Sequence, residues 1–145
     1  MALVGSSAGG AVAVEATKRG APVDALALLA APAGWVSFAD DPAGAVRRIT
    51  EEARMPLSEE TLNDPTAWAG EFDMVITERS VVDIKVPLLV VHGTADDVVP
   101  VNHANRIADR ARKAELRLIE GAAHQLRRDE NAIAIVLDWL DRTIR

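Results

Sequence analysis

Cysteine is absent from this 145-residue sequence, and so is tyrosine. Without cysteine the chain can form no disulfide, no thiolate metal site and no cysteine nucleophile. A chain without disulfides fits a reducing compartment, so we expect a cytoplasmic protein. Aromatic residues make up only 3% of the sequence, so a segment in which they gather is informative.

Positive charge is also scarce, because 16 lysines and arginines face 22 acidic residues and the net charge is -6. No basic stripe can neutralise phosphates, and the doublets Arg47-Arg48 and Arg127-Arg128 have acidic neighbours. No apolar run reaches the length of a membrane-spanning helix. The apolar stretch 1–16 lacks the basic start of a secretion signal. We therefore expect neither a nucleic-acid partner nor a membrane partner.

The chain is organised around the five residues Gly5-Ser6-Ser7-Ala8-Gly9, which follow a short apolar run and precede an alanine-rich stretch. This G-x-S-x-G pattern is typical of a nucleophile elbow, a sharp strand-to-helix turn that projects a serine hydroxyl above a sheet. The turn brings backbone close to backbone, so we expect the positions of Gly5 and Gly9 to require small residues, and Gly10 to extend that requirement. A Gly/Ser loop without chemistry would look the same, so Ser7 needs partners elsewhere.

Apolar runs at 25–31 and 86–91 predict buried parallel strands, and the alternating run at 116–119 predicts a strand near an edge. Apolar periodicity predicts helices at 10–19, 102–113 and 129–144. The last helix has a predicted inner stripe of Ile133, Val136, Leu137, Leu140 and Ile144. This alternation predicts an α/β fold, with a parallel sheet of about four strands flanked by helices in a single domain, residues 1–145.

Residues 34–82 interrupt the alternation, because apolar periodicity weakens and acidic residues and prolines accumulate. We interpret this stretch as a lid or insertion within the domain, with short helices near 43–55 and 58–63. Large apolar side chains gather in it, and they form either the wall of a substrate pocket or anchors that hold the lid to the sheet. These residues are Trp35, Phe38, Trp68, Phe72 and Met74.

A serine nucleophile requires a base, and the base requires an orienting acid. Of the three histidines, His124 lies in a small-residue loop after the last strand, His92 is interpreted as structural, and His103 as a surface or capping residue. The loop after the 86–91 strand offers Asp96 and Asp97 as acids or as turn-capping residues. Loops that follow parallel strands share one edge of the sheet, where ligand chemistry takes place.

Ser7, Asp96 and His124 follow the chain order of the α/β-hydrolase triad. The sequence resembles the α/β-hydrolase family over nearly all of its length, particularly small esterase and serine-peptidase-like members. The segment His92-Gly-Thr-Ala-Asp96-Asp-Val-Val-Pro100 resembles the family's acid loop, and Gly121-Ala-Ala-His124 its histidine loop. The resemblance implies that Ser7 is the nucleophile, His124 the base, Asp96 the acid and the Ala8 backbone N–H an oxyanion donor.

The implied activity is cleavage of a small-molecule carboxylic ester through an acyl-enzyme, without metal or cofactor, and amide or peptide cleavage is the nearest variant. In the family, several strands and a loop with the second oxyanion N–H precede the elbow, whereas this sequence begins shortly before it. We therefore expect the C-terminal half of the fold, weak or absent activity, and self-association through the exposed edge of the elbow strand.

A catalytically inactive domain that binds a ligand or partner is the alternative. A dinucleotide site and a P-loop are both disfavoured, because the glycines near Ser7 fit neither pattern.

Overall fold

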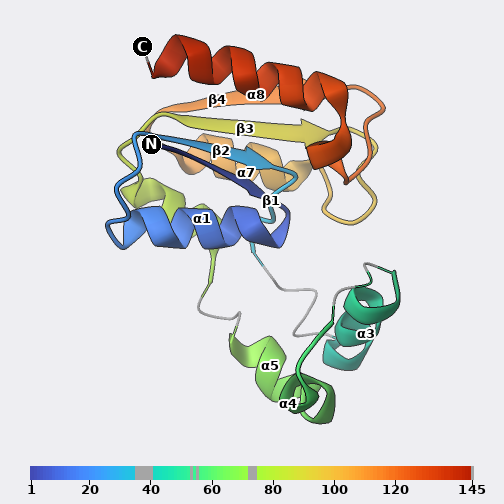
Figure 1. Cartoon of the computed structure of the whole chain (residues 1–145). Coiled ribbons are helices and arrows are strands. Elements are labelled where there is room, and N and C mark those ends of the chain that lie inside the picture. The colour runs from blue at the N-terminus through green and yellow to red at the C-terminus, as the bar shows by residue number, and fades with distance from the viewer. Residues whose placement is uncertain (35–40, 53, 55, 72–74, 145) are drawn as a thin grey trace. The chain divides into compact units, whose positions relative to one another are not determined.

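A computed structural model describes residues 1–34, 41–52, 54, 56–71 and 75–144. The chain divides into two compact units, one formed by Met1–Gly34 with Thr77–Arg145 and the other by Trp35–Ile76 (Figure 1). The predicted insertion at 34–82 contains the whole second unit, whereas residues 77–82 belong to the first. The single domain and the lid both stay predictions.

The first unit is built on four parallel strands in the order β1-β2-β3-β4. They are β1 (Ala2–Ser6), β2 (Ala25–Leu29), β3 (Leu88–Gly93) and β4 (Ala114–Ile119). In register, Val4 pairs with Ala27, Ala27 with Leu89, and Leu89 with Glu115. Within the described residues β1 and β4 form the two edges of the sheet. The predicted α/β fold with about four parallel strands is confirmed.

Alternate side chains of the two central strands serve opposite faces of the sheet, as strand geometry requires. Leu28 of β2 and Val90 of β3 pack against α1 (Ala8–Lys18) and α7 (Asn102–Arg110). Leu29 and Val91, one residue further along each strand, pack beneath α8 (Glu130–Thr143). Figure 1 shows α8 on one face and α1 and α7 on the other. The central strands are therefore buried on both sides, which explains their continuous apolar sequences.

Helix α8 faces the sheet with a different stripe from the predicted one. Ala132, Val136 and Trp139 are its buried residues, whereas Leu137 is 61% exposed. Ile133 and Ile144 are also exposed, so three of the five predicted inner positions are wrong. The helix is rotated so that the large indole of Trp139 enters the core beside Leu126. No described helix is both long and apolar enough to cross a membrane.

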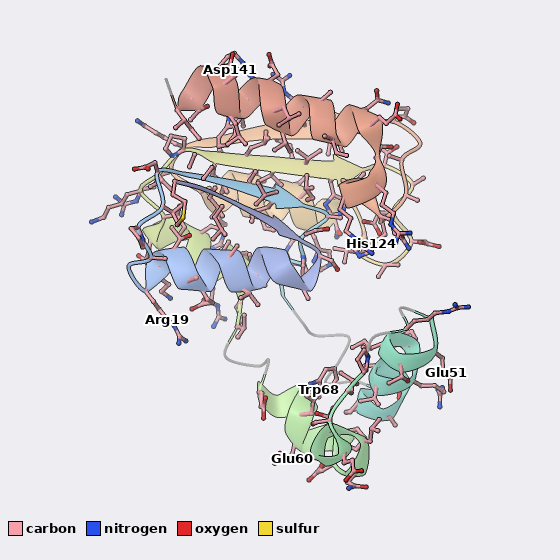
Figure 2. The ribbon with its side chains drawn as sticks, viewed as in Figure 1. Arg19, Glu51, Glu60, Trp68, His124 and Asp141 are labelled. Atoms are coloured by element: carbon pink, nitrogen blue, oxygen red, sulfur yellow. The ribbon has the colours of Figure 1, made fainter. Side chains whose placement is uncertain are left out.

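The described residues of the second unit form four short helical segments: α3 (Pro42–Arg47), the π-helical η1 (Arg48–Glu52), α4 (Glu59–Asn63) and α5 (Pro65–Glu71). Asp41 and Ser58 cap α3 and α4, because their side chains accept hydrogen bonds from Gly44 N–H and Thr61 N–H. The sequence did not predict α5, which carries Trp68 (Figure 2). These caps explain how helices form where apolar periodicity is weak.

Two segments of the first unit, which flank the second unit in the sequence, meet in one hydrogen-bonded junction. The Ala33 carbonyl accepts a hydrogen bond from the Glu78 N–H at 3.1 Å, at the start of α6 (Thr77–Ser80). The Ala33 N–H donates to His103 Nδ1 on α7 at 3.0 Å. Arg106, also on α7, makes two hydrogen bonds to the Glu78 carboxylate. Helix α7 therefore binds both of these flanking segments.

Candidate active site

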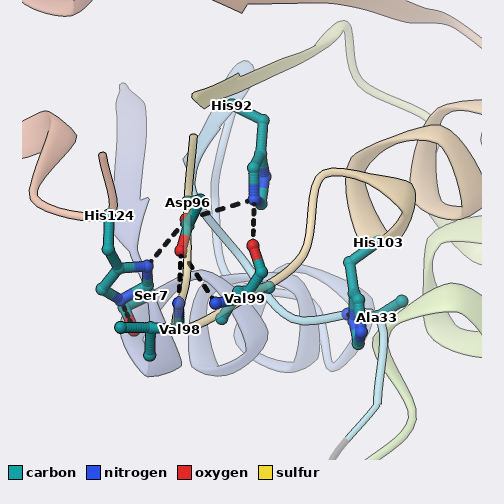
Figure 3. Close-up of polar contacts among 8 residues, drawn as sticks. All are labelled: Ser7, Ala33, His92, Asp96, Val98, Val99, His103 and His124. Carbon is teal, nitrogen blue, oxygen red and sulfur yellow. Dashed lines mark hydrogen bonds and ion pairs between the residues drawn. The ribbon is translucent and has the colours of Figure 1, made fainter. Parts of the chain in front are cut away.

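Three loops bring their polar side chains to the carboxyl edge of the sheet. Ser7 follows β1, Asp96 follows β3, and His124 follows β4 (Figure 3). Because all four strands run parallel, their carboxyl ends lie at the same edge. The topology thus gathers residues separated by up to 117 positions in the sequence.

Ser7 occupies a strained backbone conformation at the junction of β1 and α1. Its φ is 53° and its ψ is -126°, a region that residues with a side chain rarely adopt. The Ser7 N–H donates to the Leu29 carbonyl at 2.8 Å, which ties the turn to the neighbouring strand. Ser7 is also the N-cap residue of α1, yet its hydroxyl makes no capping bond. The hydroxyl is therefore free to serve another partner.

Close backbone packing beneath Ser7 requires glycine at two positions. A Cβ on Gly5 would lie 2.5 Å from the Gly9 carbonyl oxygen, and a Cβ on Gly10 would lie 2.6 Å from the Ala31 Cβ. A Cβ on Gly9 would meet no described atom within 4 Å. The expectations for Gly5 and Gly10 are confirmed and that for Gly9 is wrong, because the tight contacts fall on Gly5 and Gly10.

A continuous hydrogen-bonded chain links the three candidate residues. Ser7 Oγ lies 2.8 Å from His124 Nε2, and His124 Nδ1 lies 2.8 Å from Asp96 Oδ2. The Asp96 side chain is fully buried, and the His124 side chain is 15% exposed. A carboxylate only accepts, so Nδ1 carries the proton and Nε2 presents a lone pair to the serine hydroxyl. This is the arrangement that a base needs in order to accept a proton from Ser7.

Backbone N–H groups of the loop that carries Asp96 bind one oxygen of its carboxylate. Oδ1 accepts hydrogen bonds from the Val98 N–H at 3.0 Å and the Val99 N–H at 2.8 Å. These bonds leave Oδ2 directed at His124. Asp97, the other candidate acid, is exposed. The structure thus brings Asp96, and not Asp97, to the histidine.

The acid loop and the histidine loop are joined directly by hydrogen bonds. Thr94 N–H donates to the Ile119 carbonyl, Thr94 Oγ1 accepts from Gly121 N–H, and Ala95 N–H donates to the Ala122 carbonyl. A Cβ on Gly93 would lie 2.1 Å from the Ala122 carbonyl oxygen, so only glycine permits this approach. The motif Gly93-Thr94-Ala95-Asp96 therefore sets the distance between acid and base.

The two remaining histidines are both partly or fully enclosed. His92 is the penultimate residue of β3, is completely buried, and has Nε2 3.3 Å from Asp96 Oδ2. The sequence interpretation placed His92 as a structural residue at the C-terminal edge of this strand and did not predict its contact with Asp96, for which the sequence carries no periodic signal. His103 is half-buried at the junction on α7, not on the surface. Burial, followed by the nearby Arg106 charge, lowers the pKa of His103.

The predicted pocket residues are only partly described. Trp35, Phe38, Phe72 and Met74 lie outside the described residues. Trp68 lies on α5 and lines a cavity of about 560 Å³ within the second unit, together with Glu60, Asp64 and Glu71. The substrate pocket stays a prediction. Among the described residues, no group of three or more metal-binding side chains is close enough to hold an ion.

The family model described as "Prolyl oligopeptidase family" matches residues 1–145. No curated protein matches the sequence. Among solved structures, MenH from S. aureus aligns with a TM-score of 0.74 and 19% identity over 99% of this chain and 69% of its own. An α/β-hydrolase enzyme from a lagoon-sediment metagenome aligns with a TM-score of 0.73 and 20% identity, over 98% of this chain and 61% of its own. The esterase domain of a Rhodothermus marinus protein aligns with a TM-score of 0.71 and 20% identity, over 99% of this chain and 62% of its own.

These similarities establish the α/β-hydrolase fold, which the sequence resemblance predicted. The chain spans about three-fifths of the length of the metagenomic enzyme and of the R. marinus domain.

Proposed function

This chain belongs to the prolyl oligopeptidase family and has the α/β-hydrolase fold, and from this premise we propose that it is a serine hydrolase that cleaves carboxylic esters. The observation that carries the proposal is the unbroken hydrogen-bonded chain from Ser7 Oγ through His124 to Asp96 Oδ2. A serine with an uncapped hydroxyl, a strained backbone and a histidine base at 2.8 Å has the arrangement expected of an activated nucleophile.

In the proposed mechanism Ser7 Oγ attacks the ester carbonyl carbon, and its proton passes to His124 Nε2. Asp96 keeps the imidazole in the tautomer that can accept this proton, and its negative charge stabilises the imidazolium that forms. The carbonyl oxygen becomes an oxyanion, which the Ala8 backbone N–H stabilises at the first turn of α1.

The tetrahedral intermediate then collapses. The bond to the leaving alkoxy group breaks, and His124 gives its proton to that group, so that an alcohol departs and an acyl-Ser7 ester remains. Water then attacks the acyl carbon while His124 accepts one water proton. Collapse of the second tetrahedral intermediate returns that proton to Ser7 Oγ and releases the carboxylic acid. This cycle requires no metal or cofactor.

Peptide or amide cleavage is the second candidate, and the description of the matching family favours it. The same three residues can perform it, since an amine replaces the alcohol as leaving group. The esterase name of the R. marinus relative favours the ester substrate. Rates with p-nitrophenyl esters and with aminoacyl p-nitroanilides, compared directly, decide between the two.

The experiment that tests the proposal measures release of p-nitrophenol from short-chain p-nitrophenyl esters by the wild-type chain and by Ser7→Ala. We expect slow turnover by the wild type and only the buffer rate with Ser7→Ala. Equal rates for the two proteins would contradict the proposed nucleophile. Binding of the ester without turnover by either would favour the alternative of an inactive, ligand-binding domain.

A further inference from the structure

A second histidine, His92, lies against the buried carboxylate of Asp96 on the side away from His124 (Figure 3). The proposed reaction gives this residue no part. Its side chain is completely buried near the carboxyl end of β3. Burying a polar ring costs free energy unless the ring makes hydrogen bonds. A fully buried imidazole this close to a proposed catalytic acid therefore requires an explanation beyond packing.

The hydrogen bonds of His92 define its protonation. Nε2 lies 2.8 Å from the Val99 carbonyl oxygen, which can only accept, so Nε2 carries the proton. Nδ1 is buried and has no hydrogen-bond partner among the described residues. A second proton at Nδ1 would be a buried donor without an acceptor, which is unfavourable. His92 is therefore a neutral ring that directs a single N–H toward the acid loop.

That single N–H closes a small ring of contacts around Asp96. His92 Nε2–H donates to the Val99 carbonyl, and the Val99 N–H donates to Asp96 Oδ1 at 2.8 Å. Asp96 Oδ2 lies 3.3 Å from His92 Nε2, which completes the ring. The shorter contact of Oδ2 is the 2.8 Å bond with His124. His92 thus fixes the turn that aims Oδ2, and it does so without a positive charge that would compete with His124 for the carboxylate.

We propose that His92 is a positioning residue for the Ser7–His124–Asp96 site: its neutral Nε2–H anchors the 96–99 turn and thereby holds Asp96 Oδ2 in line with His124 Nδ1. This inference rests on the proposed function of that site. His92 touches neither substrate nor reacting atoms and acts only through Asp96. Without the anchor, the buried Val99 carbonyl loses its partner and the turn rearranges to recover one.

Two amide variants separate positioning from packing. In His92→Gln the side-chain amide reaches about as far as imidazole Nε2 and can donate to the Val99 carbonyl. In His92→Asn the amide ends near the position of Nδ1 and cannot. Both variants replace the ring with an amide, and asparagine is one methylene shorter than glutamine, so thermal unfolding of both measures the stability cost of each and confirms that they fold.

Two measurements read the effect. One is the kcat and KM of ester hydrolysis, and the other is the far-downfield NMR resonance of the His124 Nδ1–H, assigned by its loss in His124→Gln. For His92→Asn we expect kcat to fall about 10²-fold, as for a misaligned catalytic group, with KM unchanged and the resonance shifted upfield or lost. For His92→Gln we expect the resonance and most of the kcat to be retained.

The outcomes each decide the inference. If His92→Asn folds and keeps both the resonance and the kcat, or if a folded His92→Gln loses both, His92 is not a positioning residue. If His92→Asn does not fold, the His92→Gln result alone decides. The resonance needs no turnover, so a wild-type chain that hydrolyses nothing would contradict the proposed function and would still leave the role of His92 measurable.

Discussion

Replacing Asp96 by asparagine removes one charge while nearly preserving shape, and the surrounding hydrogen bonds determine the consequence. Oδ1 accepts from the Val98 and Val99 N–H groups, so the asparagine oxygen must take that position. The amide nitrogen then takes the position of Oδ2 and directs its N–H groups at His124 Nδ1. Donor would face donor unless the His124 ring gives up its proton at Nδ1.

The imidazole therefore changes tautomer, with its proton on Nε2. That nitrogen faces the Ser7 hydroxyl at 2.8 Å and can no longer accept its proton. The stabilisation of the imidazolium is lost as well. We expect kcat to fall about 10⁴-fold, as for the equivalent change in a serine protease triad. This loss corresponds to about 5.4 kcal/mol of transition-state stabilisation, at 1.36 kcal/mol per factor of ten.

The assay is steady-state hydrolysis of a p-nitrophenyl ester by Asp96→Asn, with Asp97→Asn as matched control. Asp97 is the exposed neighbour, so its replacement makes the same charge change without altering the hydrogen-bonded chain. We expect the control to keep wild-type kcat and both variants to fold, as judged by thermal unfolding. A loss of less than about tenfold in folded Asp96→Asn would refute the assignment of Asp96 as the orienting acid.

Three further predictions concern stability and assembly. Gly5→Ala should lower the free energy of unfolding by about 1–3 kcal/mol, because the added Cβ meets backbone, whereas Gly9→Ala should not lower it. Equal effects of the two substitutions in denaturant titrations would contradict the packing described at the elbow. The pKa of His103 is lowered by burial and then by Arg106, so the stability that it contributes is present above about pH 6.5 and is lost as the pH falls below that value. Chemical denaturation across pH should show that the free energy of unfolding falls less steeply with acid for His103→Asn than for the wild type. An identical pH dependence would contradict this role of His103. Edge strand β1 carries the exposed Val4 and no charged residue, so light scattering should detect self-association of the wild type, and Val4→Lys should reduce it. If the wild type and Val4→Lys are both monomers, chains do not pair at this edge.

The structure brings together Ser7, Asp96 and His124, which the sequence singled out because each has a local signature. Ser7 lies in a G-x-S-x-G turn, and Asp96 and His124 follow apolar runs that form buried strands. Parallel strands end at one edge, so the order of elements alone brings these loops together. The contact of His92 with Asp96 could not be predicted in this way, because it depends on how the 96–99 turn folds back on β3.

The errors arose where two local patterns were equally good. Helix α8 carries apolar residues on neighbouring faces, and the stripe of Ala132, Val136 and Trp139 faces the sheet instead of the one with Ile133 and Leu137. Periodicity alone does not rank two adjacent apolar stripes, whereas the burial of the large Trp139 side chain does. At the elbow the sequence pattern assigned a small-residue requirement to both Gly9 and Gly10, and only the contact with Ala31 shows that Gly10 has it and Gly9 does not.

Covalent labelling by a fluorophosphonate, with the modified residue mapped by mass spectrometry, gives the sharpest test of Ser7 as the nucleophile. Such reagents react with a serine whose proton a neighbouring base accepts, and they need no knowledge of the natural substrate. We expect one adduct per chain, located on Ser7, absent in Ser7→Ala and strongly slowed in His124→Gln. An adduct that persists in Ser7→Ala, or a wild-type chain that does not react, would contradict the assignment of Ser7 as the nucleophile.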